Sequence, residues 1–195
     1  MIRLARPTML VFAASLLVGC DPPPEAADAA AEPAGIAAAD MLAYLESKID
    51  IAEDKFIQLA EAVPEESYDW RPMEDVRSFR EIFLHIAADN WYGGALMGVQ
   101  TPEDIAVTGD GETVTAYQDQ VLSKAETLEH LRRSFVYFSG ALDATRDHLD
   151  TPAKLRTTEL TYGDLWVRLV THMHEHLGQT IAYARANEIV PPWSR

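Results

Sequence analysis

Residues 161–187 carry the sequence TYGDLWVRLVTHMHEHLGQTIAYARAN, and this stretch decides the fold. It predicts a helix that begins at Thr161 and continues to about Asn187, because inward-facing side chains recur every three or four residues. These side chains are Leu165, Leu169, His172, His176, Gln179 or Thr180, and Tyr183. An amphipathic stripe of this kind needs other helices to cover it, and here the stripe continues through two histidines.

Three earlier segments show the same spacing of apolar residues. The first ends before Pro64, which cannot continue a helix, and its seam is Leu42, Leu45, Ile49, Ala52, Phe56, Leu59 and Val63. The second runs from a capping-box pattern at residues 78–81 to about Met97, and its apolar face is Phe79, Ile82, Phe83, Ile86 and Gly93. The third begins after Ser123, and its seam is Leu128, Leu131, Phe135, Phe138, Leu142, Thr145 and Leu149.

The connection between the second and third segments, residues 98–120, contains Thr101-Pro102 and Gly109-Asp110-Gly111 and predicts a long loop or a small excursion. No segment shows the alternation of a strand, and no internal repeat is present. The sequence therefore predicts an all-α fold, a four-helix bundle over residues 40–195. Short links fit an up-down-up-down order, while the long second connection also permits a crossover.

The N-terminus predicts export. Residues 1–19 combine Arg3 and Arg6 with a short apolar run, which is typical of a signal peptide and too short to span a membrane. The run ends in Leu17-Val-Gly-Cys20, which resembles a bacterial lipobox, so Cys20 is predicted to be lipidated after cleavage. An ordinary signal peptide with a chance cysteine is the alternative.

Residues 20–39 are predicted to form a flexible tether, because they are mostly Ala, Pro and acid and cannot bury a core. Several acyl chains on Cys20 would hold the protein at a membrane. We expect an exported, membrane-anchored lipoprotein on the periplasmic side, and Asp21 resembles an inner-membrane retention signal.

The composition excludes several classes of protein. The chain has 195 residues, 31 acidic against 16 basic, and a net charge of −15. Removing residues 1–19 takes away two arginines and no acid, which leaves −17. Such a surface argues against nucleic-acid binding, which needs clustered cations. The single cysteine excludes an internal disulfide and a thiolate-rich zinc site.

The six histidines divide by helix face. His172 and His176, one turn apart on the inward stripe, can share one metal ion. His85 lies midway along the second helix, and alone it would be a satisfied core histidine. His174 is predicted to point away, and His130 and His148 to be solvated.

Three imidazoles brought together predict a metal site at His85, His172 and His176. Neutral imidazole favours Zn, Ni, Co or Fe over Mg or Ca, and buried ring nitrogens need partners. A merely structural cluster is the alternative. The spacing excludes a zincin, whose helix needs a Glu directly after its first histidine and a second histidine three residues after that Glu. His172 is followed by Met173, and His174-Glu175 has Gly178 where the second histidine would stand.

These residues resemble the DinB-like superfamily. The resemblance rests on Trp70-Arg71-Pro72, on Ser78 leading to Leu84-His85-Ile86-Ala87, on His172-x-x-x-His176-Leu-Gly178-Gln179 and on Pro191-Pro192, and it covers residues 40–195. It implies a four-helix bundle whose three histidines bind a divalent metal, commonly Zn or Ni, with open positions. Relatives include S-transferases that use bacillithiol or mycothiol and a mycothiol-dependent isomerase, whereas many members have no assigned reaction.

Two classes of function follow from the resemblance and the site. The first is a metal-dependent enzyme, either a thiol-dependent S-transferase or a hydrolase, with a small-molecule substrate and, for the transferase, a thiol cosubstrate. The second is a non-catalytic metal-binding or partner-binding lipoprotein, in which the metal is structural. A homodimer is compatible with either.

Five residues near the histidines have expected roles. Asp89, one turn after His85, is the candidate for proton transfer or for orienting a ligand, with a plain surface acid as the alternative. Tyr92 and Tyr183 could line the pocket or simply pack. Gln179 could orient a ligand, and Gly178 is expected to let two helices approach closely.

Overall fold

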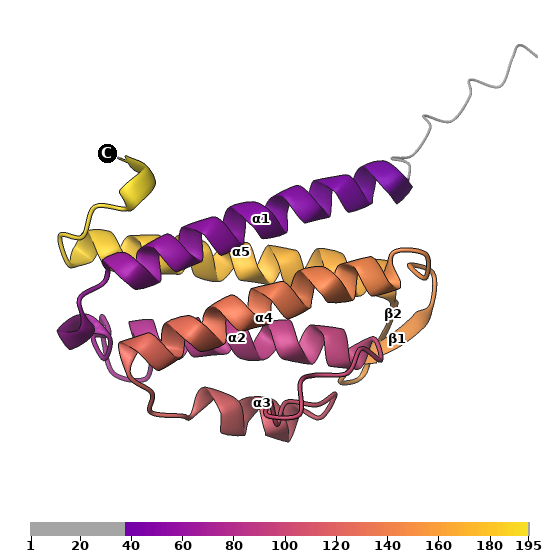
Figure 1. Ribbon diagram of the computed structural model, residues 1–195, viewed down its shortest axis with the longest axis horizontal. Coiled ribbons are helices and arrows are strands. Elements are labelled where there is room, and N and C mark those ends of the chain that lie inside the picture. The colour runs from indigo at the N-terminus through magenta and orange to yellow at the C-terminus, as the bar shows by residue number, and fades with distance from the viewer. Residues whose placement is uncertain (1–37, 195) are drawn as a thin grey trace, which may run out of the picture. The chain divides into compact units, whose positions relative to one another are not determined.

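The computed structural model describes residues 38–194. The predicted signal peptide, Cys20 and nearly all of the predicted tether lie outside the described residues. The predicted bundle is confirmed, because four long helices account for most of the described chain (Figure 1). They are α1 (Ala38–Ala62), α2 (Phe79–Leu96), α4 (Lys124–Thr145) and α5 (Tyr162–Ala186).

Each long helix packs against two of the others: α1 contacts both α4 and α5, and α2 also contacts both α4 and α5. Helix α4 runs antiparallel to α1: Lys124 at its start donates to the carbonyl of Val63 at 2.7 Å, and Arg146 just beyond its end pairs with Glu46. Helices α2 and α4 run in the same direction, as Figure 1 shows. The chain therefore adopts the crossover arrangement that the long second connection permits, and not the up-down-up-down order.

The connection that makes this crossover contains a short helix, α3 (Gly111–Gln118), which packs on α2. Tyr117 fixes α3 to the bundle. Its hydroxyl accepts a 3.1 Å hydrogen bond from Trp91 Nε1 and lies 2.5 Å from His130 Nδ1. The sequence predicted only a loop or excursion here, since eight residues are too few for a seam to show.

A hairpin of β1 (Pro152–Leu155) and β2 (Thr158–Thr161) joins α4 to α5. The prediction of no strands was therefore wrong, because four-residue strands are too short for a visible alternation. Helix α4 also ends at Thr145 rather than continuing through Leu149. Leu149 packs against the core from outside the helix.

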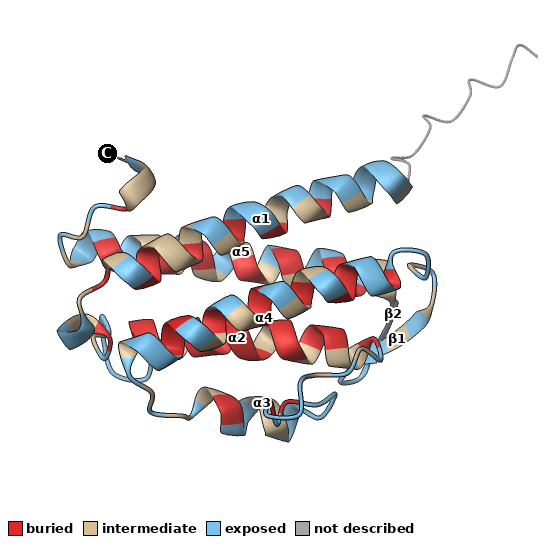
Figure 2. Cartoon of the chain, in the orientation of Figure 1, coloured by how far each residue is buried: buried red, intermediate tan, exposed pale blue. Residues whose placement is uncertain are grey.

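Helix α2 lies at the centre of the core and is buried on almost every side (Figure 2). Its predicted apolar face is confirmed, and its start is fixed by the predicted capping box between Ser78 and Glu81. The close approach of α2 and α5 occurs at Gly93, where an added Cβ would lie 2.6 Å from Leu169 Cδ1. The expectation for Gly178 was wrong, because a Cβ there meets nothing within 4 Å.

Two 3-10 turns complete the described chain, at Glu65–Ser67 and at Pro192–Ser194. The second lies against α1, where Lys55 sits over the ring of Trp193. None of the helices within residues 38–194 is long and apolar enough to cross a membrane.

Candidate metal centre

The histidines of α5 stand at the edge of its buried face rather than at its centre. The side chains that are buried are Leu165, Trp166, Val170, Met173, Leu177, Thr180, Tyr183 and Ala184. His172, His176 and Gln179 are half-buried beside them. The sequence analysis placed the histidines in the middle of the buried face of this helix. In the structure the middle of that face lies a fraction of a turn away, at residues such as Met173 and Leu177. This edge faces α2, which brings the α5 histidines to His85.

His85, His172 and His176 converge, and one nitrogen from each ring lies within 4.8 Å of the other two. The Nε2 atoms of His85 and His172 are 3.1 Å apart. The centroid of His176 is 4.5 Å from each of the other two rings, and all three rings are nearly perpendicular to one another. The predicted set of three is therefore the set that the fold assembles.

The orientation of His176 is fixed from its outer side. Its Nδ1 lies 2.8 Å from Gln179 Oε1, so Nδ1 carries the proton and Nε2 keeps a free lone pair. Gln179 is held in turn, because its Nε2 donates to the hydroxyl of Tyr183 at 2.9 Å. Tyr183 packs edge-on against Trp70 and Phe79. This chain of contacts is typical of the support that a metal-binding imidazole receives.

His172 lies between two carboxylates. Its Nδ1 is 3.4 Å from Glu175 Oε2, and its Nε2 is 3.2 Å from Asp89 Oδ2. The hydrogen bond with Asp89 raises the pKa of His172 above its ordinary value, and Glu175 adds to this. In the metal-free protein His172 is thus the histidine of the cluster that most readily holds an extra proton.

The other two imidazoles are held neutral. Burial lowers the pKa of His85 to about 4, although nearby Asp89 opposes the shift. Burial also lowers the pKa of His176, although its hydrogen bond with Gln179 opposes the shift. Neutral imidazole is the form that binds a metal, so the site is prepared for one at neutral pH.

The geometry fits a divalent transition metal. Two nitrogens at about 2.0–2.1 Å from a tetrahedral zinc are about 3.3 Å from each other, close to the spacing of the two Nε2 atoms. Two lone pairs at such a distance repel unless a proton or a cation lies between them. Among the described residues, the buried Nδ1 of His85 has no hydrogen-bond partner, and it is the Nε2 of this ring that faces His172 and Asp89. The three histidines could therefore hold a metal ion.

Asp89 reaches the same point from α2. Its Oδ2 is 3.4 Å from His85 Nε2 and 3.2 Å from His172 Nε2, so it faces the nitrogens that would bind a metal. It does not belong to the group of ligand atoms within 4.8 Å of one another, which contains the three histidines alone. The carboxylate is thus beside the centre, where it can accept a proton or bond to a ligand.

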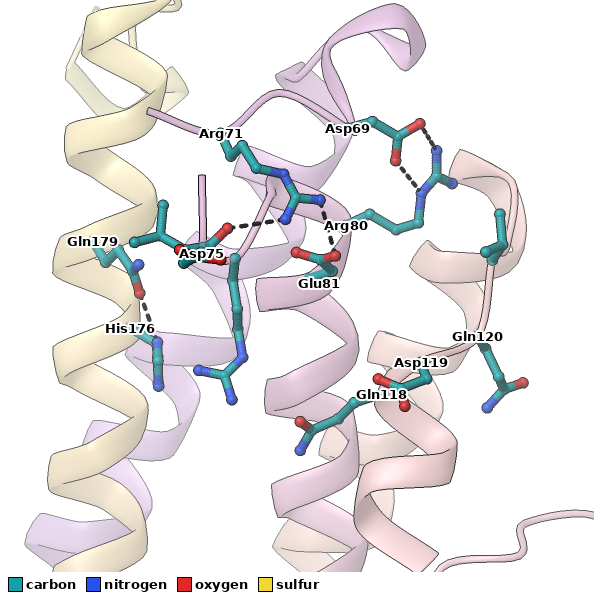
Figure 3. A pocket seen from close by; sticks show the side chains of 13 residues that line it. Asp69, Arg71, Asp75, Arg80, Glu81, Gln118, Asp119, Gln120, His176 and Gln179 are labelled. Carbon is teal, nitrogen blue, oxygen red and sulfur yellow. Dashed lines mark hydrogen bonds and ion pairs between the residues drawn. The ribbon is translucent and has the colours of Figure 1, made fainter. Parts of the chain in front are cut away.

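A polar cavity of about 850 Å³ opens beside His176 (Figure 3). His176 and Gln179 line it from α5, the segment before α2 forms a second wall, and the end of α3 forms a third. A small pocket lies on the other side of the cluster, where Asp89 and His172 meet Phe138 and Leu169. His176 therefore faces the wide cavity, and His172 faces the small pocket.

The remaining histidines lie elsewhere, as predicted for two of them. His174 points toward α1, where its Nε2 is 3.0 Å from the carbonyl of Lys48, and His148 is exposed. His130 is half-buried against Tyr117, so its predicted solvation was wrong; the missed helix α3 covers it. Tyr92 does not line the polar cavity, and Tyr183 acts through Gln179.

The sequence analysis missed the cavity wall formed by the segment before α2. Three arginines, Arg71, Arg77 and Arg80, line the cavity from this segment and from the first turn of α2. The available signal was their density, since three cations within ten residues are unusual in a chain with 16 basic residues against 31 acidic ones.

The fold and the cluster together define a four-helix-bundle protein with a candidate three-histidine metal centre. The sequence model of the DinB superfamily matches residues 48–180, and the chain belongs to this superfamily. The fold is similar to the crystal structure of a DinB-like protein from Bacillus cereus ATCC 10987, at 15% identity and a TM-score of 0.62. That alignment covers 76% of this chain and 93% of the other. A comparison with curated proteins finds no match.

Proposed function

We propose that this protein is a divalent-metal-dependent enzyme that acts on a small molecule entering through the polar cavity. His85, His172 and His176 would hold the metal, with Zn or Ni as the ions that suit three imidazoles. When bound, such an ion supplies Lewis-acid activation of a thiol or of water. The observation that carries the proposal is the position of His176, which belongs both to the histidine cluster and to the wall of the cavity.

The side chains around the centre have distinct tasks in this proposal. Gln179 holds the His176 ring in one tautomer, so that its Nε2 faces the centre. Asp89 is placed to accept a proton from a thiol or a water that occupies the open side, because it lies within 3.4 Å of two of the facing nitrogens. It is the residue to which we assign proton transfer.

Two reactions fit this arrangement. In an S-transferase, a thiol cosubstrate would give its proton to Asp89 and attack an electrophilic carbon of the second substrate, and the leaving group would depart from that carbon with the electron pair of the broken bond. In a hydrolase, water would take the place of the thiol. Because Cys20 is the only cysteine and is proposed to be lipidated, the thiol must come from a cosubstrate. Bacillithiol and mycothiol are cytoplasmic, so an exported protein would need another thiol, and this favours testing hydrolysis alongside transfer.

The proposed location is the periplasmic face of a membrane, through acyl chains on Cys20 and with the acidic segment 21–39 as tether. A retention signal at Asp21 would keep the protein at the inner membrane. The acidic surface and this location both favour small-molecule substrates over nucleic acids.

A non-catalytic protein with a structural metal is the second candidate, and Asp89 is the observation that favours it. If this carboxylate closes the coordination, no position remains for a substrate. The experiment replaces the metal with Co²⁺ in the full chain and adds cyanide or a small thiol. An open site binds these ligands and changes its visible spectrum, whereas a closed site leaves the spectrum unchanged and refutes the enzyme proposal. A panel of ester and thiol-transfer substrates then separates hydrolase from transferase.

A further inference from the structure

We infer that Arg77 selects a substrate with a carboxylate group and holds that group in the polar cavity while the reacting atom lies at the histidines. This inference rests on the proposed function and adds the class of substrate. It begins from a difference among the three arginines of the cavity.

Two of these arginines are engaged in building the wall. Arg71 donates to Glu81 Oε1 at 2.9 Å and to the carbonyl of Val76 at 3.1 Å. Arg80 forms a two-pronged pair with Asp69, at 2.8 and 3.1 Å (Figure 3). Each of these two guanidinium charges is already paired with a carboxylate of the protein.

Arg77 is different. It is exposed in the cavity, and within residues 38–194 no carboxylate forms an ion pair with it. His176, a member of the histidine cluster, lines the same cavity. The guanidinium of this cavity that has no carboxylate partner among the described residues therefore shares the cavity with a candidate metal ligand.

The segment that carries Arg77 is held in place. Arg77 immediately precedes Ser78, whose side chain and backbone are both bonded to Glu81 in the capping box. On the other side of Arg77, the carbonyl of Val76 is bonded to Arg71. Backbone bonds from Phe79 to Trp70 and from Arg80 to Tyr68 close the segment onto itself. A guanidinium on a fixed backbone loses less entropy when it binds a ligand.

The charge balance explains why the partner should be an anion. A divalent ion on three neutral imidazoles, with Arg77 in the adjoining cavity, brings three positive charges, whereas the two carboxylates that touch the imidazoles, Asp89 and Glu175, supply two negative ones. A negative group between the centre and Arg77 relieves this repulsion. Arginine binds a carboxylate through two parallel hydrogen bonds, which also fixes the orientation of the substrate.

The same cavity disfavours highly charged anions. Asp75 and Asp119 line it, are exposed, and form no ion pair among the described residues. A phosphate ester carries up to two negative charges and would meet one free guanidinium and two free carboxylates. A single carboxylate is therefore the better match.

The test compares two thiols of equal length, 3-mercaptopropionate and 3-mercapto-1-propanol, by calorimetry on the zinc-loaded full chain. We expect the carboxylate thiol to bind roughly ten- to a hundredfold more tightly, as for a charged two-pronged hydrogen bond. Arg77→Gln should abolish this preference and leave the affinity for the alcohol unchanged, and Arg77→Lys should restore part of it. Arg168→Gln, which removes an exposed arginine outside the cavity, is the matched control.

The outcomes separate this inference from the proposed function. Equal binding of the two thiols by the unaltered protein, or an equal loss of both in Arg77→Gln, overturns the role of Arg77. If the chain takes up no metal, the proposed function fails, and the same pair is then compared on the metal-free protein by NMR. If the metal-free protein still prefers 3-mercaptopropionate, and Arg77→Gln abolishes this preference, the carboxylate site is supported. Tighter binding of inorganic phosphate than of 3-mercaptopropionate overturns it.

Discussion

Replacing Asp89 with Asn should change how metal binding depends on pH. In the metal-free protein the pKa of His85 is about 4, the pKa of His176 is lowered, and the pKa of His172 is raised. As the pH falls from neutrality, His172 is therefore the first of the three to take up a proton. A metal must displace this proton, because only neutral imidazole binds.

The release of this one proton sets the expected slope of zinc affinity against pH. Below the pKa of His172, the logarithm of the apparent association constant for Zn²⁺ should rise by about one per pH unit, and above it the curve should level off. Three ordinary histidines would give a slope approaching three. Asp89→Asn removes the largest cause of the raised pKa of His172, so the break in the curve should move to lower pH.

The variant should also bind zinc less tightly on the plateau. Loss of a carboxylate charge 3.2–3.4 Å from two of the facing nitrogens should weaken the affinity about ten- to a hundredfold. The assay is competition with a chromophoric chelator between about pH 5.5 and 8, with Asp147→Asn, an exposed acid on another surface, as the control. A slope of two or three in the unaltered protein, or an Asp89→Asn curve that matches it at every pH, refutes the reasoning.

Three further predictions concern single side chains. Because the pKa of His85 is about 4 in the folded protein, protonation of this ring opposes folding. The free energy of unfolding should therefore be highest above about pH 6.5 and fall toward pH 4. At about pH 5 the loss is about 2 kcal/mol, and the raised pKa of His172 offsets part of it. Urea unfolding of the metal-free protein should show this loss, and His85→Gln should reduce it. Gln179→Leu frees the His176 ring and should weaken zinc binding about tenfold or more in chelator competition; unchanged affinity would contradict the role of Gln179. Tyr117→Phe leaves the buried Trp91 N–H without its acceptor and should cost about 1–3 kcal/mol in urea unfolding, whereas Tyr44→Phe, at an exposed position, should cost nothing measurable.

Much of the bundle could be predicted from the sequence, because its long helices carry continuous seams and clear caps. The capping boxes at Ser78, Ser123 and Thr161 set the starts of α2, α4 and α5 within a residue. Helix α3 and the β1–β2 hairpin could not be predicted in the same way. Their contacts are made with the bundle, through side chains such as Tyr117, and a segment of four to eight residues shows no period of its own.

The histidine cluster could be predicted because two of its members lie one turn apart on one helix edge. His85 joins them only through the packing of α2 against α5. The sequence places His85 on one face of its helix, and the structure shows its Nε2 at 3.1 Å from the Nε2 of His172. Arg77 could not be predicted. Its significance depends on Arg71 and Arg80 being engaged elsewhere, and that depends on contacts with Glu81 and Asp69.

The central claim is that His85, His172 and His176 bind one divalent metal ion. The most direct test is elemental analysis of the full chain after supply of Zn²⁺ and Ni²⁺, beside His85→Ala, His172→Ala and His176→Ala. His148→Ala, which removes an exposed histidine outside the cluster, serves as the control. We expect about one ion per chain in the unaltered protein and the control, and loss of the ion from each of the three variants. No metal in the unaltered protein, or equal retention by all variants, would contradict the account.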